Sequence, residues 1–335
     1  MPMPDLEVKT LSEDEYPLWN AFVLNAPQGT FFHQSAWTEI ISLATGRPLR
    51  IIVCKRGEDI LAGLILFDNL KWGLNMATPV PLIPFNGPLL GVMDQAGEHK
   101  VIARTLQYSE LFVRFLTKYY DFWILDTGFG FHDIRSFQWA GCKLEPVYTY
   151  QKKMAAGIEL EDTYNQSLRR KIKESEDLGI SVKQVDYTEK FLDLYQKSYN
   201  RHDINPPVGK AMIKKILTMI IKLPQIKLFV AELENKILAG RVILEDQNAI
   251  YDLMAGGDDP TGLGATYTVH TVLSKYAKTE KHFDFMGAGH PGVEQFKRSF
   301  GGKLELGFRL TGKVRFPLSF LINMRNANLT RRRKL

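Results

Sequence analysis

The tetrapeptide Ile-Leu-Ala-Gly occurs twice in this chain, at residues 60–63 and again at residues 237–240. In both places an apolar run is followed by a short charged turn and a second apolar run, within residues 50–67 and 226–245. Apolar runs of this length, separated by a turn, predict β-hairpins. A chain that carries the same hairpin in each half is expected to contain one folding unit twice.

A second pair of segments supports the duplication. Residues 122–145 and 282–305 each contain an aromatic strand, a glycine-rich loop, a short helix, a glycine turn and the sequence Lys-Leu-Glu. The two pairs follow in the same order in each half of the chain. The alternative is that hairpins and strand–loop–helix units look alike in any α/β protein.

The rest of each half predicts further elements around these segments. A third strand is expected after each hairpin, in LKWGLNMATP and in AIYDLMAGG. Helices are expected at residues 34–45, 98–119, 190–201, 209–222 and 265–279. This pattern predicts an α/β (α+β) fold with a mixed, partly antiparallel sheet in each half. At about 150 residues per domain, we expect domains at 1–155 and 156–322, followed by a basic tail at 323–335.

The composition bounds the class of partner. The net charge of +6 and the pI of about 9.1 favour anionic partners, namely phosphate-bearing cofactors, nucleic acid or membrane surfaces. The sequence contains neither HExxH nor CxxC, so we expect no metal site. Two cysteines, no signal peptide and no run of roughly 18 apolar residues predict a cytoplasmic chain without a transmembrane segment.

Several segments together resemble a known family. In the first half they are FFHQSAWTEII, ILAGLILF, PFNGPLL and TYQKKM; in the second they are SLRRKIKESEDLGISV, LFVAELENKILAG, HFDFMGAG and GVEQFKRSFGGKLE. The chain resembles the FemAB-like branch of the Gcn5-related N-acyltransferase (GNAT) superfamily, and the last segment is the most specific. The resemblance implies two tandem GNAT-like domains and transfer of an acyl or aminoacyl group to a peptidoglycan precursor or exopolysaccharide.

The same resemblance leaves the acyl donor open between aminoacyl-tRNA and acyl-CoA, with no cofactor bound permanently. In acyl-CoA users, backbone N–H groups at a helix N-terminus hold the pyrophosphate. The matching residues here are Gly262, Gly264 and Ala265. They are preceded by Asp259, which would repel a pyrophosphate. The long charged helical hairpin that tRNA-reading members often carry is not evident either.

The two copies differ where chemistry would be expected. A gapless comparison of residues 122–145 with 282–305 places polar side chains in the second copy alone. The matched pairs are Ile124 and Asp284, Gly130 and His290, and Phe137 and Lys297. We therefore expect the second half to be reactive and the first to be degenerate.

Acyl transfer to an amine passes through a tetrahedral oxyanion and needs a hydrogen-bond donor and a route for a proton. The resemblance implies that Lys297 stabilises the oxyanion or the substrate, that Asp284 orients Lys297 or accepts a proton, and that Tyr251 donates a hydrogen bond at the reacting centre. The structural alternatives are a solvated lysine, a carboxylate that caps a loop and a tyrosine packed in the core.

Other polar residues are candidates for binding the substrate. They are Tyr195, Arg201 and His202 near the end of a helix, Asp252 on the third strand, His290 in a glycine-rich loop, and Arg169 and Arg170 on a basic helix expected at 167–182. The structural alternative for the basic helix is a solvated charged face. The basic residues 331–334 would suit peripheral contact with anionic lipid and a lipid-linked acceptor, or form a disordered tail.

Two other functions remain open at this point. One is an acyl-CoA-dependent N-acetyltransferase acting on a small amine or sugar, against which Asp259 argues. The other is a non-catalytic binding protein on a degenerate scaffold, against which the contrast between Lys297 and Phe137 argues.

Overall fold

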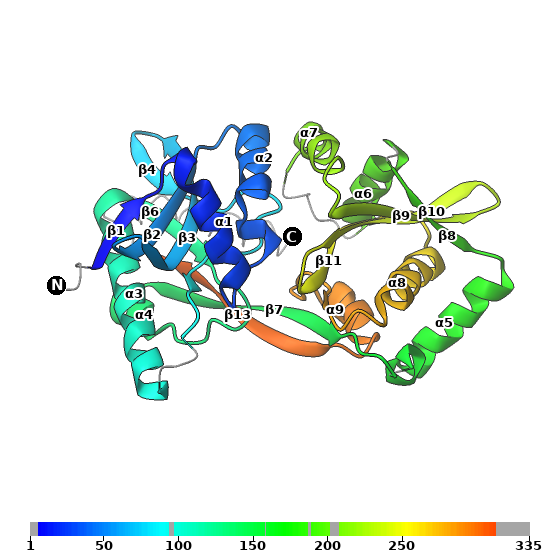
Figure 1. Cartoon of the computed structure of the whole chain (residues 1–335). Coiled ribbons are helices and arrows are strands. Elements are labelled where there is room, and N and C mark those ends of the chain that lie inside the picture. Colours follow the sequence, from blue (N-terminus) through cyan, green and yellow to red (C-terminus); the bar gives the residue numbers. More distant parts are fainter. Residues whose placement is uncertain (1–5, 94–96, 158, 187–188, 202–207, 313–335) are drawn as a thin grey trace. The chain divides into compact units, whose positions relative to one another are not determined.

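The computed structural model describes residues 6–93, 97–157, 159–186, 189–201 and 208–312, with only the backbone of Arg201. These residues fall into two compact units (Figure 1). Unit 1 consists of the described parts of Met1–Pro146 and Gly307–Leu335, and unit 2 is formed by Val147–Leu306.

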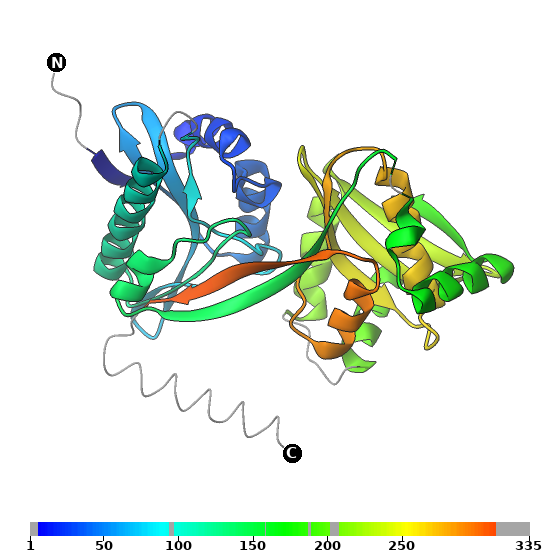
Figure 2. The same cartoon turned by 90° about the horizontal axis from the view of Figure 1, so that it is seen from below.

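Unit 1 is a mixed sheet with helices on both faces. Its strands are β1 (Leu6–Thr10), β2 (Leu49–Arg56), β3 (Asp59–Lys71), β4 (Leu74–Ala77), β5 (Leu89–Leu90) and β6 (Phe122–Asp126), together with the end of β13 (Lys303–Thr311). Its α-helices are α1 (Tyr16–Asn25), α2 (Ser35–Thr45), α3 (Glu98–Tyr119) and α4 (Arg135–Trp139). Both views show α1 and α2 on one face of this sheet and α3 with α4 on the other (Figures 1 and 2).

Unit 2 has the same layers. Its strands are β8 (Ser181–Val185), β9 (Ile226–Leu233), β10 (Lys236–Glu245), β11 (Ala249–Gly257) and β12 (His282–Asp284), together with the end of β7 (Lys143–Lys153). Its α-helices are α5 (Gln166–Asp177), α6 (Glu189–Arg201), α7 (Lys210–Ile220), α8 (Leu263–Tyr276) and α9 (Pro291–Arg298). α6 packs on β10 and β11 next to α7, and α8 covers β9 and β10 together with α5 (Figure 1).

The strand pairings repeat between the units. Unit 1 has the order β1-β2-β3-β4-β6 and unit 2 the order β8-β9-β10-β11-β12 read from the matching edge. In each unit the first three pairs are antiparallel and the fourth pair, β4 with β6 or β11 with β12, is parallel. The predicted pair of mixed α/β units is confirmed.

The last strand of each unit comes from the other half of the sequence. In unit 1, Arg309–Thr311 of β13 pair with β6, and in unit 2 the pairing strand of β12 is the end of β7. The compact units therefore differ from the predicted domains 1–155 and 156–322, which divide the chain into its two sequence repeats. The predicted tail at 323–335 lies outside the described residues.

The repeated tetrapeptide has a packing role in each unit. A Cβ on Gly63 would lie 2.3 Å from the ring of Trp19 on α1, and a Cβ on Gly240 would lie 2.8 Å from the ring of Phe191 on α6. Both distances are shorter than atoms can approach. Glycine is therefore required at both positions because a large aromatic side chain from the covering helix rests directly on the strand.

One predicted helix is shorter than expected. Residues 167–182 were expected to be helical throughout, but α5 ends at Asp177 and β8 begins at Ser181. Gly179 between them has φ +75°, a left-handed conformation that ends a helix easily when the residue is glycine. The segment after it, Ile-Ser-Val, then joins the sheet.

Candidate active site

Lys297 lies on α9 and is buried in unit 2, with 9% of its surface exposed. Its Nζ donates hydrogen bonds to the carbonyl oxygens of Met286, at 2.9 Å, and Gly287, at 2.8 Å. Both residues have left-handed backbone conformations, with φ values of +55° and +86°. Since an ammonium has three N–H donors, this arrangement leaves one for a further acceptor.

Burial lowers the pKa of Lys297 to about 8, because the charged form loses its water. The carboxylates of Asp252 and Asp284 act in the opposite direction, and the guanidinium of Arg241 adds to the lowering. A lysine with a pKa near neutrality can both donate and recover a proton under ordinary conditions. Such a perturbed group on a short helix is a candidate for function.

Asp284 holds the loop that binds Lys297. Its fully buried carboxylate accepts hydrogen bonds from Thr149 Oγ1, at 2.7 Å, Gln151 Nε2, at 2.9 Å, and the backbone N–H of Met286, at 2.7 Å. The Thr149 hydroxyl also accepts a bond from the N–H of Gly287, at 3.0 Å. Burial raises the pKa of Asp284, and these donors and Lys297 oppose the increase. Asp284 thus positions Lys297 through the 286–287 backbone.

Arg241 and Asp252 form a buried ion pair in the same unit. The pairing of β10 with β11 shifts by one residue between Val242 and Ile243, so that Asp252 and Arg241 share one face of the sheet. Asp252 Oδ1 and Arg241 Nε are buried and have no hydrogen-bond partner among the described residues. Burial raises the pKa of Asp252, while Arg241 and Lys297 counteract this. Buried atoms left without partners in a charged cluster are typical of a site that binds something.

Sequence reasoning missed Arg241, Thr149 and Gln151. A signal for Arg241 was available, because ILAG is followed by Arg241 in the second copy and by the apolar Leu64 in the first. The other two carried no signal, because they belong to a strand that the sequence assigns to the first repeat.

The remaining predicted residues lie in varied places. The hydroxyl of Tyr251 donates to Asp246 Oδ2, at 3.2 Å. Tyr195 is buried, and its ring centre lies 4.9 Å from that of Tyr199. His290 is the half-buried N-cap residue of α9. Arg169 and Arg170 are exposed on α5; the side chain of Arg201 and all of His202 lie outside the described residues. The roles proposed for these residues stay predictions.

The N-terminus of α8 is the place where the family would hold the pyrophosphate of CoA. Here the Asp259 carboxylate accepts hydrogen bonds from Gly264 N, at 3.0 Å, Thr261 N, at 2.9 Å, and Thr261 Oγ1, at 2.6 Å. Burial opposes ionisation, yet these bonds lower the pKa of Asp259. A negative side chain therefore occupies the N–H groups that a phosphate would need, and the residues present do not fit a CoA pyrophosphate.

Two of the predicted cofactor residues have packing roles. A Cβ on Gly264 would lie 2.6 Å from Leu238 Cβ, so glycine lets α8 approach β10. Ala265 packs at the edge of a small core cluster. Gly262 is the N-cap residue of α8, with φ +73°. All three are explained by helix placement, without a bound phosphate.

Among the described residues, no group of three or more His, Cys, Asp or Glu side chains is arranged to hold a metal ion. None of the helices in the described ranges is long and apolar enough to cross a membrane.

Comparison with known proteins places this geometry in a family. Residues 163–298 match the family model described as acetyltransferase (GNAT) domain. A comparison with curated protein sequences gave no match. Among solved structures, FemX has a TM-score of 0.68 and 14% sequence identity, and the match covers 94% of this chain and 99% of FemX.

Two further structures share the fold. One is the C-terminal domain (DUF2156) of a proposed lysylphosphatidylglycerol synthetase from Agrobacterium fabrum, with a TM-score of 0.57, 11% identity and coverage of 95% of this chain and 97% of that one. The other is a tandem GNAT protein from the clavulanic acid biosynthesis pathway, with a TM-score of 0.51, 12% identity and coverage of 92% and 99%. Residues 163–298 therefore form a GNAT domain, and the chain as a whole has the tandem GNAT fold that its resemblance to the FemAB-like branch implies.

Proposed function

We propose that this protein is an aminoacyltransferase of the FemAB-like type, which moves an aminoacyl group from a charged tRNA to an amine of a cell-envelope precursor. The observation that carries the proposal is the position of Asp259, whose carboxylate occupies the N-terminus of α8. A GNAT domain that has filled its own pyrophosphate site needs a donor held in another way. The net charge of +6 suits an RNA donor.

The fold comparison supports the same class of reaction. The protein from A. fabrum is named for making lysylphosphatidylglycerol, an aminoacyl phospholipid, and its domain shares this fold. An envelope acceptor that is lipid-linked would agree with that name. The identity of the acceptor and the peripheral membrane contact predicted for the basic tail are part of this proposal.

The chemistry would take place at Lys297. The acceptor amine attacks the carbonyl carbon of the aminoacyl ester, a C–N bond forms, and the carbonyl oxygen becomes an oxyanion. The third N–H of Lys297 donates to that oxyanion. When the ester C–O bond breaks, Lys297 gives a proton to the departing ribose oxygen and recovers one from the attacking nitrogen, which its pKa of about 8 allows. Asp252 and Asp284 favour the charged form of Lys297 between these transfers.

The test compares donors. Purified full-length protein is incubated with a cell-envelope extract and either charged tRNA or acetyl-CoA, and the mass added to the product is measured. We expect an aminoacyl product with charged tRNA, and neither an acetylated product nor thermal stabilisation with acetyl-CoA. Acetylation by the wild type would overturn the proposal and favour the acyl-CoA-dependent N-acetyltransferase, which the acetyltransferase family model and Gly262 and Gly264 support.

A variant examines the reason as well as the outcome. Asp259→Gly removes the carboxylate from the α8 N-terminus, so it should create measurable stabilisation by CoA that the wild type lacks. Asp177→Asn, which removes an exposed charge at the end of α5, serves as the matched control and should bind CoA no better than the wild type. If both variants behave like the wild type, the occupation of the helix N-terminus by Asp259 is not what excludes CoA.

A further inference from the structure

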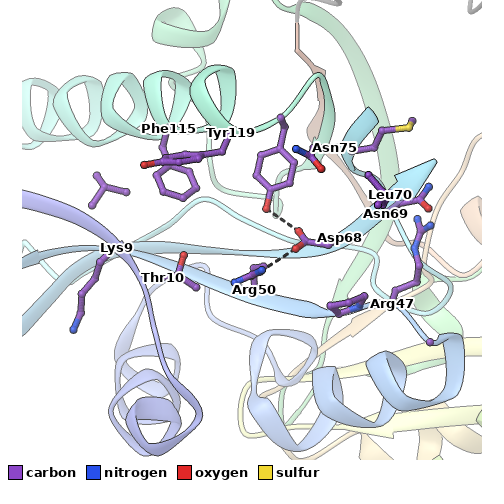
Figure 3. A pocket seen from close by; sticks show the side chains of 15 residues that line it. Lys9, Thr10, Arg47, Arg50, Asp68, Asn69, Leu70, Asn75, Phe115 and Tyr119 are labelled. Atoms are coloured by element: carbon purple, nitrogen blue, oxygen red, sulfur yellow. Dashed lines mark hydrogen bonds and ion pairs between the residues drawn. The ribbon is translucent and has the colours of Figure 1, made fainter. Parts of the chain in front are cut away.

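Unit 1 contains a pocket of about 800 Å³ to which no step of the proposed reaction refers (Figure 3). It lies where β2 begins and β3 ends, next to the C-terminal end of α3. Its volume falls in the range of roughly 300–1,000 Å³ that is usual for small-molecule sites. In unit 2, by contrast, the family's donor site lies at the N-terminal end of the equivalent helix, α8. The pocket is therefore at the other end of its unit from the position of a CoA cradle.

The pocket exists because unit 1 lacks one side chain that unit 2 has. In both units an acid at the end of a strand is held by a cation and a tyrosine. In unit 1, Asp68 accepts from Arg50 Nε, at 2.9 Å, and from the Tyr120 hydroxyl, at 2.8 Å.

In unit 2, Glu245 accepts from Lys227, at 2.6 Å, and from the Tyr276 hydroxyl, at 2.9 Å. It also accepts from Lys281, at 2.7 Å. The residue of unit 1 that matches Lys281 in the sequence comparison is Asp121, whose carboxylate instead accepts from the N–H of Asn75. The cationic lysine that completes the cluster in unit 2 thus has no equivalent in unit 1.

The charges around the pocket are unbalanced. Its lining includes three cations, Lys9, Arg47 and Arg50, and one acid, Asp68. Lys9 is paired with Glu15 and Arg50 with Asp68. Arg47 donates from Nη2 to Thr78 Oγ1, at 2.6 Å, but makes no ion pair within the described part of the chain, and its Nε is a buried donor without an acceptor there. Arg47 is therefore the side chain whose charge the protein does not itself neutralise.

The opposite side of the pocket is aromatic. The rings of Phe115 and Tyr119 have centres 4.6 Å apart, and Tyr119 is 50% exposed. Figure 3 shows these two rings on one side of the Arg50–Asp68 pair and Arg47 on the other. The cationic and aromatic groups are thus separated along the pocket, as a ligand with an anionic end and a flat body would require.

We propose that this pocket binds a small phosphorylated molecule with a planar ring, of the nucleoside monophosphate type. The phosphate would lie against Arg47, because a guanidinium offers paired donors that match phosphate oxygens. The ring would stack on Tyr119, away from the phosphate. This orientation also keeps the negative group away from the C-terminus of α3, where the helix dipole disfavours anions.

The test uses calorimetric titration of the full-length protein with AMP, adenosine and inorganic phosphate. AMP should bind more tightly than either of the others, since it alone engages both ends of the pocket. Arg47→Ala should weaken AMP binding by about tenfold or more, because a hydrogen bond to a charged group is lost. Tyr119→Ala should reduce the affinity for AMP to that for inorganic phosphate. Arg114→Ala, which removes an exposed arginine on α3, is the matched control.

Several outcomes would overturn the proposal: no binding of any probe by the wild type, adenosine binding as tightly as AMP, or Arg47→Ala binding AMP as well as Arg114→Ala does. If Arg47→Ala does not fold, Arg47→Lys keeps the charge and removes the paired donors, so it should still bind AMP more weakly. Lys297→Met should leave AMP binding unchanged, which separates this site from the proposed acyl transfer.

Discussion

The two units bury their charges in different ways. In unit 1 the positions that match Arg241 and Lys297 are Leu64 and Phe137, and both are fully buried in one apolar core cluster. In unit 2 the same places hold two cations and, next to them, Asp252. Burying charge is costly even when it is paired. The same fold is therefore stabilised by an apolar core in one copy and gives up part of that core in the other.

The buried carboxylates show the same contrast. Asp126, at the end of β6, is held by the guanidinium of Arg309 through two bonds of 2.6 and 2.8 Å. Asp284, at the end of β12, is held by the neutral donors Thr149 and Gln151 and by a backbone N–H. Unit 1 neutralises its carboxylate directly, whereas unit 2 leaves that charge to act on Lys297. This comparison supports unit 2 as the reactive half.

The largest test of the comparison replaces Lys297 by the apolar type of side chain found in unit 1. Lys297→Met should lower kcat by about 10²–10³-fold, as the loss of one donor to an oxyanion does elsewhere. The fold should persist, since an apolar side chain suits this position in unit 1. Lys303→Met, at a side chain that is 82% exposed, is the control and should keep full turnover.

Unchanged turnover in Lys297→Met would show that the chemistry lies elsewhere. If the wild type forms no product with any donor, the non-catalytic binding protein on a GNAT scaffold becomes the better explanation.

The second test uses pH. Below about pH 8 Lys297 is charged in both the folded and the unfolded chain, and the full cost of burying that charge is present. Between about pH 8 and 10.5 the unfolded chain binds more protons, so the free energy of unfolding should rise with pH, by up to about 3 kcal/mol. Turnover should instead fall above about pH 8, because the ammonium is lost.

Urea denaturation and initial rates across this range would measure both trends. Burial also lowers the pKa of Lys152 to about 8, so the wild type must be compared with Lys297→Met to isolate one lysine. Equal slopes of stability against pH in the two proteins would mean that Lys297 is not the titrating group.

The smallest effect is expected in unit 1. Asp126→Asn removes the charge that Arg309 binds and should lower the free energy of unfolding by about 1–3 kcal/mol, while kcat stays unchanged. Asp284→Asn should show the reverse emphasis, with turnover falling because the 286–287 loop no longer positions Lys297. Urea denaturation and steady-state rates of the two variants form a matched pair. A loss of turnover in Asp126→Asn with intact stability would contradict the assignment of chemistry to unit 2.

The sequence by itself determined the duplication, the mixed α/β units, most of the helices and the contrast of Lys297 and Asp284 with Phe137 and Ile124. These features depend on local periodicity and on comparison of two copies, which need no knowledge of distant contacts. The glycines of the repeated tetrapeptide could be found in the same way, although the reason for them, an aromatic ring resting on each strand, could not.

Only the tertiary structure decided how the charges meet. The exchange of β7 and β13 between repeats brings Thr149 and Gln151 to Asp284, and no local pattern predicts a strand that pairs outside its own repeat. The shifted pairing of β10 with β11 places Arg241 beside Asp252, and the turn before α8 places Asp259 on its N–H groups. These contacts depend on register and packing between segments far apart in the sequence, where residue types alone leave many arrangements open.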